Sequence, residues 1–369
     1  MDFDTDILSR EEQVIFALRA LYARSGYGPF KMSKFEEYEL YVRNKDFLIS
    51  DGVITFTDTD GKLLALKPDV TLSIVRSAMP APGTVQKLYY DEKVYRISSS
   101  ARGFREITQM GLECIGAVDD YCIGEVLGLA AQSLRLISED CTLCVSHLGV
   151  VGAVLEELAL PAEAEARVRK CIGEKNPHEL EEVCRACGVG EAQLARLRVL
   201  LQCSGAPEEV LPRLEALGCE PVALRQLRLL RDMLADGGLE PLLRFDFSVL
   251  SDPRYYNGVA FQGFVRGVPS RVISGGQYDK LLGRMGRNGG AVGFAVYLDL
   301  LERLGRGGSR FDADTLLLYD EGTDPRRLAA AVRERTAAGE SVSAQRAVPE
   351  KLRFRRRMKL TESGVVPLD

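Results

Sequence analysis

The strand-forming segments of this 369-residue chain lie on both sides of a long helical stretch, and this split is the strongest constraint on its fold. Residues 150–237 are rich in leucine, alanine and glutamate at helical spacing, with few β-branched runs. Apolar segments typical of strands precede and follow this stretch, at residues 86–97, 106–115, 141–148, 242–250, 259–265 and 271–273. Segments distant in sequence from its first strands therefore complete the sheet.

The long hairpin predicted before the helical stretch indicates the character of the sheet. Residues 86–97 and 106–115 bracket a polar loop, which is typical of antiparallel strands joined directly. Strands in hairpins, with helices gathered to one side, indicate the α+β class rather than alternating βαβ units. We therefore predict a mainly antiparallel sheet flanked by helices, with a helical insertion.

A glycine-rich segment divides the end of the chain from the rest. Gly305–Ser309 has the composition of a flexible linker, and a strand at 315–319 and a helix at 324–338 follow it. The segment after the linker is long enough only for a small α/β unit. We expect the chain to be divided into residues 1–149 and 238–305 as two portions of one core, 150–237 as the insertion, and 311–369 as the C-terminal unit.

Charge and hydropathy exclude several classes of protein. The first residues are acidic where a secretory signal is basic, and no apolar run approaches the roughly 20 residues that span a bilayer. We expect a soluble cytoplasmic protein with no membrane segment. The net charge of -5 disfavours a protein that coats nucleic acid. A basic run at 351–359 is either a contact for RNA or an acidic partner, or a solvated surface.

The nine cysteines do not form a recognisable metal or disulfide framework. They are an odd number spread over a long chain, so we expect reduced thiols. Cys141 and Cys144 lie in a predicted strand, where residues three apart point to opposite faces. Cys184 and Cys187 lie on a predicted helix with His178 upstream, which leaves zinc open there, but buried thiols are the simpler interpretation. We expect no metal and no cofactor.

Five sequence blocks, in order along the chain, resemble the catalytic core of class II aminoacyl-tRNA synthetases, and of histidyl-tRNA synthetases in particular. The resemblance covers about residues 9 to 305 and implies the antiparallel sheet of that family. Each block alone is a weak signal, and their order makes the signal specific. The blocks are Leu66-Lys67-Pro68-Asp69-Val70-Thr71, Val94-Tyr95-Arg96, Arg105 to Glu113, Ser251 to Gly263, and Gly275-Gly276-Gln277-Tyr278-Asp279.

The resemblance implies a pocket for free histidine. A zwitterionic amino acid needs acceptors for its ammonium group, donors for its carboxylate and polar partners for two imidazole nitrogens. Gln109 and Glu113 are four apart in a predicted strand and therefore project from the same face. The family pattern assigns the amino group to Asp69, Thr71 and Gln109. It assigns the imidazole to Glu113, Tyr256 and Tyr278.

Departures from the family pattern argue against catalysis. Adenylate formation needs positioned arginines that stabilise charge on the α-phosphate. The histidine-specific arginine is replaced by Ser251, and the arginine of the third class II motif by Leu300. Ile107 stands at the adenine-stacking position and Gln277 replaces a further arginine, while Arg96 is retained as a phosphate or carboxylate contact. We therefore predict no catalytic residues.

A synthetase core without its catalytic charges resembles the regulatory subunits of ATP phosphoribosyltransferase, which act in histidine biosynthesis. That resemblance implies a short-form catalytic phosphoribosyltransferase as partner and L-histidine as the effector that transmits feedback inhibition. It also implies self-association through the synthetase-like core, in a segment around 27–56 where Ser33 replaces the family's proline. The short C-terminal unit makes tRNA binding unexpected, because an anticodon-binding domain has roughly a hundred residues.

Two alternatives remain open at this stage. One is an active histidyl-tRNA synthetase, which a pyrophosphate-exchange assay with histidine and ATP would identify. The other is a free-standing paralogue that activates a different acid. This enzyme would need Arg96 together with a replacement cation, for which Arg102 and Arg254 are the nearby candidates.

Overall fold

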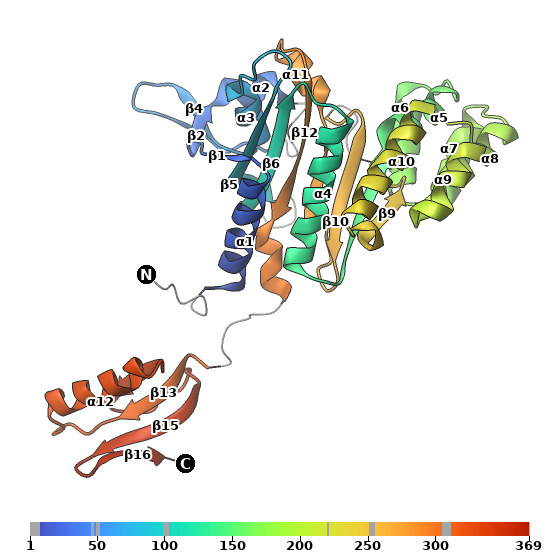
Figure 1. Cartoon of the computed structure of the whole chain (residues 1–369). Coiled ribbons are helices and arrows are strands. Elements are labelled where there is room, and N and C mark those ends of the chain that lie inside the picture. Colours follow the sequence, from blue (N-terminus) through green and yellow to red (C-terminus); the bar gives the residue numbers. More distant parts are fainter. Residues whose placement is uncertain are drawn as a thin grey trace. The chain divides into compact units, whose positions relative to one another are not determined.

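The computed structural model describes residues 8–45, 48, 52–98, 103–219, 221–250, 255–304 and 311–368. The chain divides into two compact units, Met1–Gly305 and Arg306–Asp369. Figure 1 shows both units. The predicted linker, Gly305–Ser309, lies outside the described residues.

A nine-stranded sheet forms the centre of the first unit, and its order departs strongly from the sequence order (Figure 1). All neighbouring pairs are antiparallel except the two pairs β1–β5 and β7–β9. The predicted α+β class is therefore confirmed. In spatial order the strands are β1 (Gly28–Phe30), β5 (Val85–Ser98), β6 (Gly103–Gly116), β12 (Gly290–Tyr297), β11 (Ile273–Gln277), β10 (Val259–Val265), β7 (Cys141–His147), β9 (Leu243–Asp246) and β8 (Ser204–Gly205).

The predicted hairpin forms the longest strand pair of this sheet. β5 and β6 pair without interruption from Val85 opposite Gly116 to Ser98 opposite Gly103. Because side chains alternate along a strand, this pair presents one row to each side of the sheet. Met110, Leu112 and Cys114 are buried on one side, whereas their neighbours in the sequence point to the other.

Two helices cover the apolar side of the sheet, α1 (Arg10–Arg24) and α4 (Asp120–Ile137). A capping box starts α1, in which Ser9 and Glu12 each accept a hydrogen bond from the other's backbone amide. Asp119 caps α4 by accepting from the amide of Cys122. Both helices bury an apolar face in one cluster with the sheet. They therefore hold β6 and β12 in place from the apolar side.

A smaller cluster lies on the opposite side and carries the site. It packs the short helices α2 (Tyr38–Arg43), α3 (Thr71–Ser77) and α11 (Asp279–Arg284) against β5 and β12. A separate three-stranded sheet borders it, with the order β2 (Phe35–Glu37), β4 (Leu63–Leu66) and β3 (Thr55–Thr57). The pocket described below lies between these elements and the polar side of the large sheet.

Helices inserted between β7 and β9 form an extension of the main core. Their buried leucines and cysteines belong to the same apolar cluster as the sheet, and α10 contacts α4. The chain then returns parallel to the strand from which it left. The helices are α5 (Leu148–Glu156), α6 (Ala162–Gly173), α7 (Pro177–Ala186), α8 (Glu191–Leu201), α9 (Pro207–Ala216) and α10 (Pro221–Asp236), followed by the 3-10 turn η3 (Glu240–Leu242).

Three elements differ from the sequence prediction. The strand expected over 242–250 ends at Asp246, because the Asp246 carboxylate accepts hydrogen bonds from the amide and hydroxyl of Ser248 and turns the chain. The strand expected over 271–273 begins at Ile273 and continues through two glycines, because its backbone pairs on both sides. The pattern of residues 291–304 predicts a strand that passes into a helix, and the helical part is the 3-10 helix η4 (Leu298–Leu304).

The second unit packs one helix, α12 (Pro325–Ala337), on a four-stranded sheet through Leu317, Ala331 and Leu360. The strands are, in spatial order, β14 (Val342–Gln345), β13 (Ala313–Leu318), β15 (Phe354–Thr361) and β16 (Gly364–Leu368). The basic run lies largely on β15. Arg355, Arg356 and Lys359 pair with Asp314, Glu340 and Asp320 respectively. These pairs favour the interpretation of the run as a solvated surface.

Candidate functional site

The floor of the pocket is a patch of two neighbouring strands, β6 and β12. Their register places three polar or small residues of one strand opposite three of the other, all on the side that the helices α1 and α4 do not cover. Neither strand dictates this patch alone, because the antiparallel pairing brings the two rows together. The pairs are Glu113 with Gly293, Gly111 with Ala295, and Gln109 with Tyr297.

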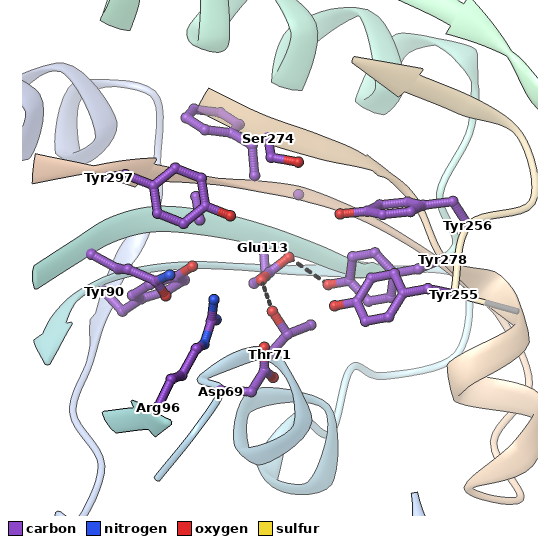
Figure 2. A pocket seen from close by; sticks show the side chains of 14 residues that line it. Asp69, Thr71, Tyr90, Arg96, Glu113, Tyr255, Tyr256, Ser274, Tyr278 and Tyr297 are labelled. Carbon is purple, nitrogen blue, oxygen red and sulfur yellow. Dashed lines mark hydrogen bonds between the residues drawn. The ribbon is translucent and has the colours of Figure 1, made fainter. Parts of the chain in front are cut away.

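Glu113 lies at the centre of the pocket, buried from solvent (Figure 2). Its carboxylate accepts hydrogen bonds from Thr71 Oγ1 at 2.6 Å and from the Tyr278 hydroxyl at 2.5 Å. Burial raises the pKa of Glu113 to about 8, against the opposing effect of those two hydrogen bonds. The side chain therefore carries a proton near neutral pH and can exchange it with a bound base.

Glycine at position 293 is required for this placement of the carboxylate. A Cβ at Gly293 would overlap Glu113 Oε2 and also meet the backbone oxygen of Leu112. Gly276 serves Tyr256 in the same way, since a Cβ there would lie 2.6 Å from a ring carbon of that tyrosine. Both glycines are needed for close approach to the site.

The start of α3 contributes Asp69 and Thr71. Asp69 Oδ1 accepts from the amide of Leu72 at 2.9 Å, so the carboxylate both caps the helix and lines the pocket. Burial raises the pKa of Asp69, and hydrogen bonds and the charge of Arg96 oppose that rise. The helix start thus holds the two side chains rigidly beside Glu113.

Among the residues that the structure describes, two donors in the pocket find no acceptor. Gln109 Nε2 is buried without a hydrogen-bond partner, and so is one terminal nitrogen of Arg96, Nη2. Arg96 is anchored by its Nε, which donates to the carbonyl of Pro68 at 3.1 Å. A buried donor without a partner typically costs about 1–3 kcal/mol, so a ligand that brings acceptor oxygens here recovers that energy.

Tyrosine rings form the walls of the pocket. The rings of Tyr255 and Tyr256 lie 4.5 Å apart between centroids, and those of Tyr255 and Tyr278 lie 5.8 Å apart. The remaining cavity measures about 30 Å³, which holds a water molecule but not an amino acid. The structure therefore shows a closed pocket, and a ligand the size of histidine requires a ring to move.

The structure gathers every predicted ligand residue that it describes around this cavity. Sequence reasoning missed four further residues of the lining that carry polar side chains. The alternation of β6 and β12 could have indicated Tyr297, which lies opposite Gln109, but that pairing is not visible in the sequence. The predicted residues are Asp69, Thr71, Arg96, Gln109, Glu113, Tyr256 and Tyr278, and the missed ones are Tyr90, Tyr255, Ser274 and Tyr297.

The positions that depart from the synthetase pattern lie away from the pocket or outside the described residues. Leu300 packs against the main apolar cluster, and Ile107 against the smaller one. Gln277 donates to the carboxylate of Asp279 at 2.9 Å. Ser251, which stands in place of the histidine-specific arginine, lies in the segment 251–254 that the structure does not describe. The candidate cations Arg102 and Arg254 also lie outside the described residues.

The described residues also show no arrangement suited to a metal or a membrane. No group of three or more histidine, cysteine, aspartate or glutamate side chains is placed to hold a metal ion in this part of the chain. All nine cysteines are free thiols. None of the described helices combines the length and apolar character needed to cross a membrane.

Comparison with known proteins gives the same family. A family model described as histidyl-tRNA synthetase matches residues 2–301. An ATP phosphoribosyltransferase regulatory subunit of Caldanaerobacter subterraneus is 30% identical over 288 residues, which cover 76% of this chain and 75% of the relative.

Solved structures agree on the fold. A protein from Bacillus halodurans, described as an ATP phosphoribosyltransferase regulatory subunit/histidyl-tRNA synthetase, superimposes with a TM-score of 0.73 at 25% identity over 91% of this chain and 88% of that one. A chain of the ATP phosphoribosyl transferase (HisG:HisZ) complex from Thermotoga maritima gives a TM-score of 0.62 at 21% identity, over 78% of this chain and 97% of that one. The chain therefore belongs to the histidyl-tRNA synthetase-like family, within the group of ATP phosphoribosyltransferase regulatory subunits.

Proposed function

We propose that this chain binds free L-histidine in the pocket around Glu113 and thereby regulates a short-form ATP phosphoribosyltransferase catalytic subunit. The observation that carries the proposal is the buried carboxyl group of Glu113, held between the hydroxyl groups of Thr71 and Tyr278. A buried acid with a raised pKa is suited to a ligand that is itself a base near neutral pH.

Histidine supplies such a base. The unperturbed pKa of imidazole is about 6.5, and burial raises the pKa of Glu113 to about 8. With these values Glu113 keeps its proton, and its neutral carboxyl group can donate a hydrogen bond to an unprotonated imidazole nitrogen without changing the net charge of the pocket. Asp69 and the hydroxyl oxygen of Thr71 supply acceptors beside it for the ammonium group. An amino acid without a basic ring would leave the Glu113 carboxyl without this partner.

The same pocket is poorly equipped for adenylate formation. The side chain in place of the third-motif arginine, Leu300, packs in the apolar core, and the adenine-stacking position holds Ile107. Removal of one transition-state charge contact typically costs a hundred-fold or more in rate. These features support a subunit that binds histidine without activating it.

The partner follows from the family. The relatives in this group are named as regulatory subunits, and the Thermotoga maritima structure is a complex of two different chains. We infer that this chain supports the activity of a catalytic partner and that histidine favours a less active arrangement of the complex. Such coupling between two sites is typically about 1–3 kcal/mol, or roughly 5- to 150-fold in apparent affinity.

Self-association through the core is part of this proposal. The three-stranded sheet exposes an edge-to-face pair of rings, Phe35 and Phe56. Exposed apolar side chains that cluster on one surface are typical of protein interfaces. A second copy of this chain is the partner we assign to that surface.

Calorimetric titration with L-histidine should show saturable binding, and Tyr278→Phe should weaken it by about 5- to 30-fold. The variant removes the hydroxyl that holds Glu113, and a buried hydrogen bond of this kind is worth about 1–2 kcal/mol. Tyr121→Phe is the matched control, because that hydroxyl contacts Glu125 on the exposed side of α4. The affinity of Tyr121→Phe for L-histidine should equal that of the unaltered chain. A flat titration with the unaltered chain would overturn the proposal.

Reconstitution with a short-form catalytic subunit tests the regulatory step. The catalytic rate should rise when this chain is added and fall again with L-histidine, while Tyr278→Phe shifts the inhibition curve to higher histidine concentrations. Pyrophosphate exchange with histidine and ATP should remain at background. Robust pyrophosphate exchange by this chain alone would show that it is a synthetase rather than a regulatory subunit.

A further inference from the structure

A second cavity of about 390 Å³ adjoins the closed pocket. Arg96 and Tyr297 line both cavities, so the two spaces share a wall. The second cavity lies along the same side of the sheet, since Gln262 on β10 pairs with Ser274 on β11, which lines the first cavity. The residues that line this cleft are Arg96, Gln262, Phe264, Ser270, Arg271 and Tyr297.

The lining of this cleft is positively charged, and Asp69, whose carboxyl group interacts with the charge of Arg96, lies in the first pocket. Two of its six lining residues are arginines, and within the described part of the chain none of the lining residues is a carboxylate. Arg96 Nη2 is buried and has no hydrogen-bond partner in the described part of the chain, although Nε is anchored on the Pro68 carbonyl. Figure 2 shows the Arg96 side chain reaching into the pocket beside Asp69. A fixed, unpaired guanidinium nitrogen at this place is suited to an anionic oxygen.

Arg271 lies at the other side of the cleft. It ends the turn between β10 and β11 and is exposed, so its long side chain has room to move. Its charge also reaches the first pocket: burial raises the pKa of the Tyr256 hydroxyl, and Arg271 acts against that rise. Tyr256 is one of the residues assigned to the imidazole, so Arg271 lies close to the ligand site without belonging to the family pattern.

We infer that Arg96 and Arg271 together bind the α-carboxylate of the amino acid in the pocket and replace the cation missing at position 251. This inference rests on the proposed histidine binding and assigns the residue that determines its specificity. With the imidazole on Glu113 and the ammonium group beside Asp69, the carboxylate faces the wall that the two cavities share. Arg96 contributes a fixed donor there, and Arg271 closes over the carboxylate from the cleft.

The inference predicts how the pocket discriminates between histidine and histamine, which has the same ring and amine but no carboxylate. Arg271→Gln should weaken L-histidine binding by about 10- to 100-fold, since hydrogen bonds to charged groups contribute about 1.5–3 kcal/mol. The same variant should leave histamine binding within about two-fold. Calorimetric titration of both ligands, with the full-length chain and in the same buffer, measures the two effects.

Arg266→Gln is the matched control for this experiment. Arg266 lies in the same turn as Arg271 and is also exposed. It pairs with Asp140 at 3.0 Å, however, and does not line the cleft. Its loss should change neither titration. Arg271→Lys should recover part of the histidine affinity, because lysine keeps the charge but not the two-pronged geometry. Thermal unfolding of each variant confirms that an exposed substitution leaves the fold intact.

The outcomes separate this inference from the function on which it rests. If the unaltered chain binds no histidine, both are wrong. If it binds histidine and Arg271→Gln binds it equally well, the carboxylate assignment alone is overturned. If Arg271→Gln loses histamine and histidine to the same extent, Arg271 shapes the pocket rather than recognising the carboxylate, and the assignment is again wrong.

Discussion

Replacement of Glu113 by glutamine should make the empty protein more stable at pH 8 and should weaken histidine binding. Burial raises the pKa of Glu113 to about 8 in the folded chain, from a value near 4.5 when it is exposed. Between these values the folded state binds a proton that the unfolded state has released. The free energy of unfolding therefore falls as pH rises from about 4.5 to about 8.

The size of this effect has an upper limit of about 5 kcal/mol at pH 8, at about 1.4 kcal/mol for each pH unit. Glutamine stays neutral, so the unaltered chain and Glu113→Gln should have similar stability near pH 4.5 and diverge as pH rises. Denaturant unfolding at several pH values measures the divergence. Calorimetry should show weaker histidine binding by the variant, because an amide replaces the carboxyl group that donates to the imidazole and accepts from Thr71 and Tyr278.

Glu106→Gln is the control on the same strand. Glu106 is exposed, and the hydrogen bond and charge of Lys93 lower its pKa. The effect on the free energy of unfolding therefore has the opposite sign. Glu106→Gln should slightly destabilise the protein above pH 4.5 and should leave the pocket unchanged. If Glu113→Gln showed no gain of stability between pH 5 and pH 8, the raised pKa of Glu113 would be wrong.

Gly293→Ala should destabilise the folded protein by about 3 kcal/mol or more and should remove histidine binding. The added methyl group would overlap the Glu113 carboxylate, and the backbone oxygen of Leu112 prevents it from moving away. Overpacking in a rigid core typically costs about 1–3 kcal/mol, and here one of the two neighbours is backbone that cannot rotate aside. Denaturant unfolding and a histidine titration on the same preparation measure both losses.

Gly128→Ala supplies the comparison for this substitution. Gly128 lies inside α4, and a Cβ there meets nothing within 4 Å. An alanine in a helix interior usually stabilises by about 0.5–1 kcal/mol relative to glycine. A Gly293→Ala chain that folds normally and binds histidine with unchanged affinity would show that the carboxylate is not held where the structure places it.

The sequence was sufficient for the parts of the site that lie on single elements. Gln109 and Glu113 share one strand, so simple alternation places both side chains on one side of the sheet. The family resemblance identified Asp69, Thr71, Tyr256 and Tyr278, each within a short sequence block. What these residues have in common is that a local motif fixes each of them.

The remaining parts depend on pairing between distant strands. Tyr297 enters the pocket because β12 pairs with β6, and Arg271 enters the adjoining cleft because β10, β11 and β12 are neighbours. No local pattern marks either residue. The closed state of the pocket is also not encoded in a motif, since it results from the packing of several tyrosine rings against each other. The end of β9 at Asp246 depended on one side-chain turn that a strand pattern does not reveal.

The order of strands in the large sheet has a consequence for synthesis of the protein. β5 and β6 leave the ribosome together and can form their hairpin at once, but the glycine that seats Glu113 is on β12, which is translated only after the whole insertion. A nascent or truncated polypeptide that lacks β12 therefore exposes an acidic side chain and lacks one strand of the pocket floor. Under the proposed function, only a molecule that includes β12 can bind histidine, so fragments released by premature termination cannot compete with it for the metabolite.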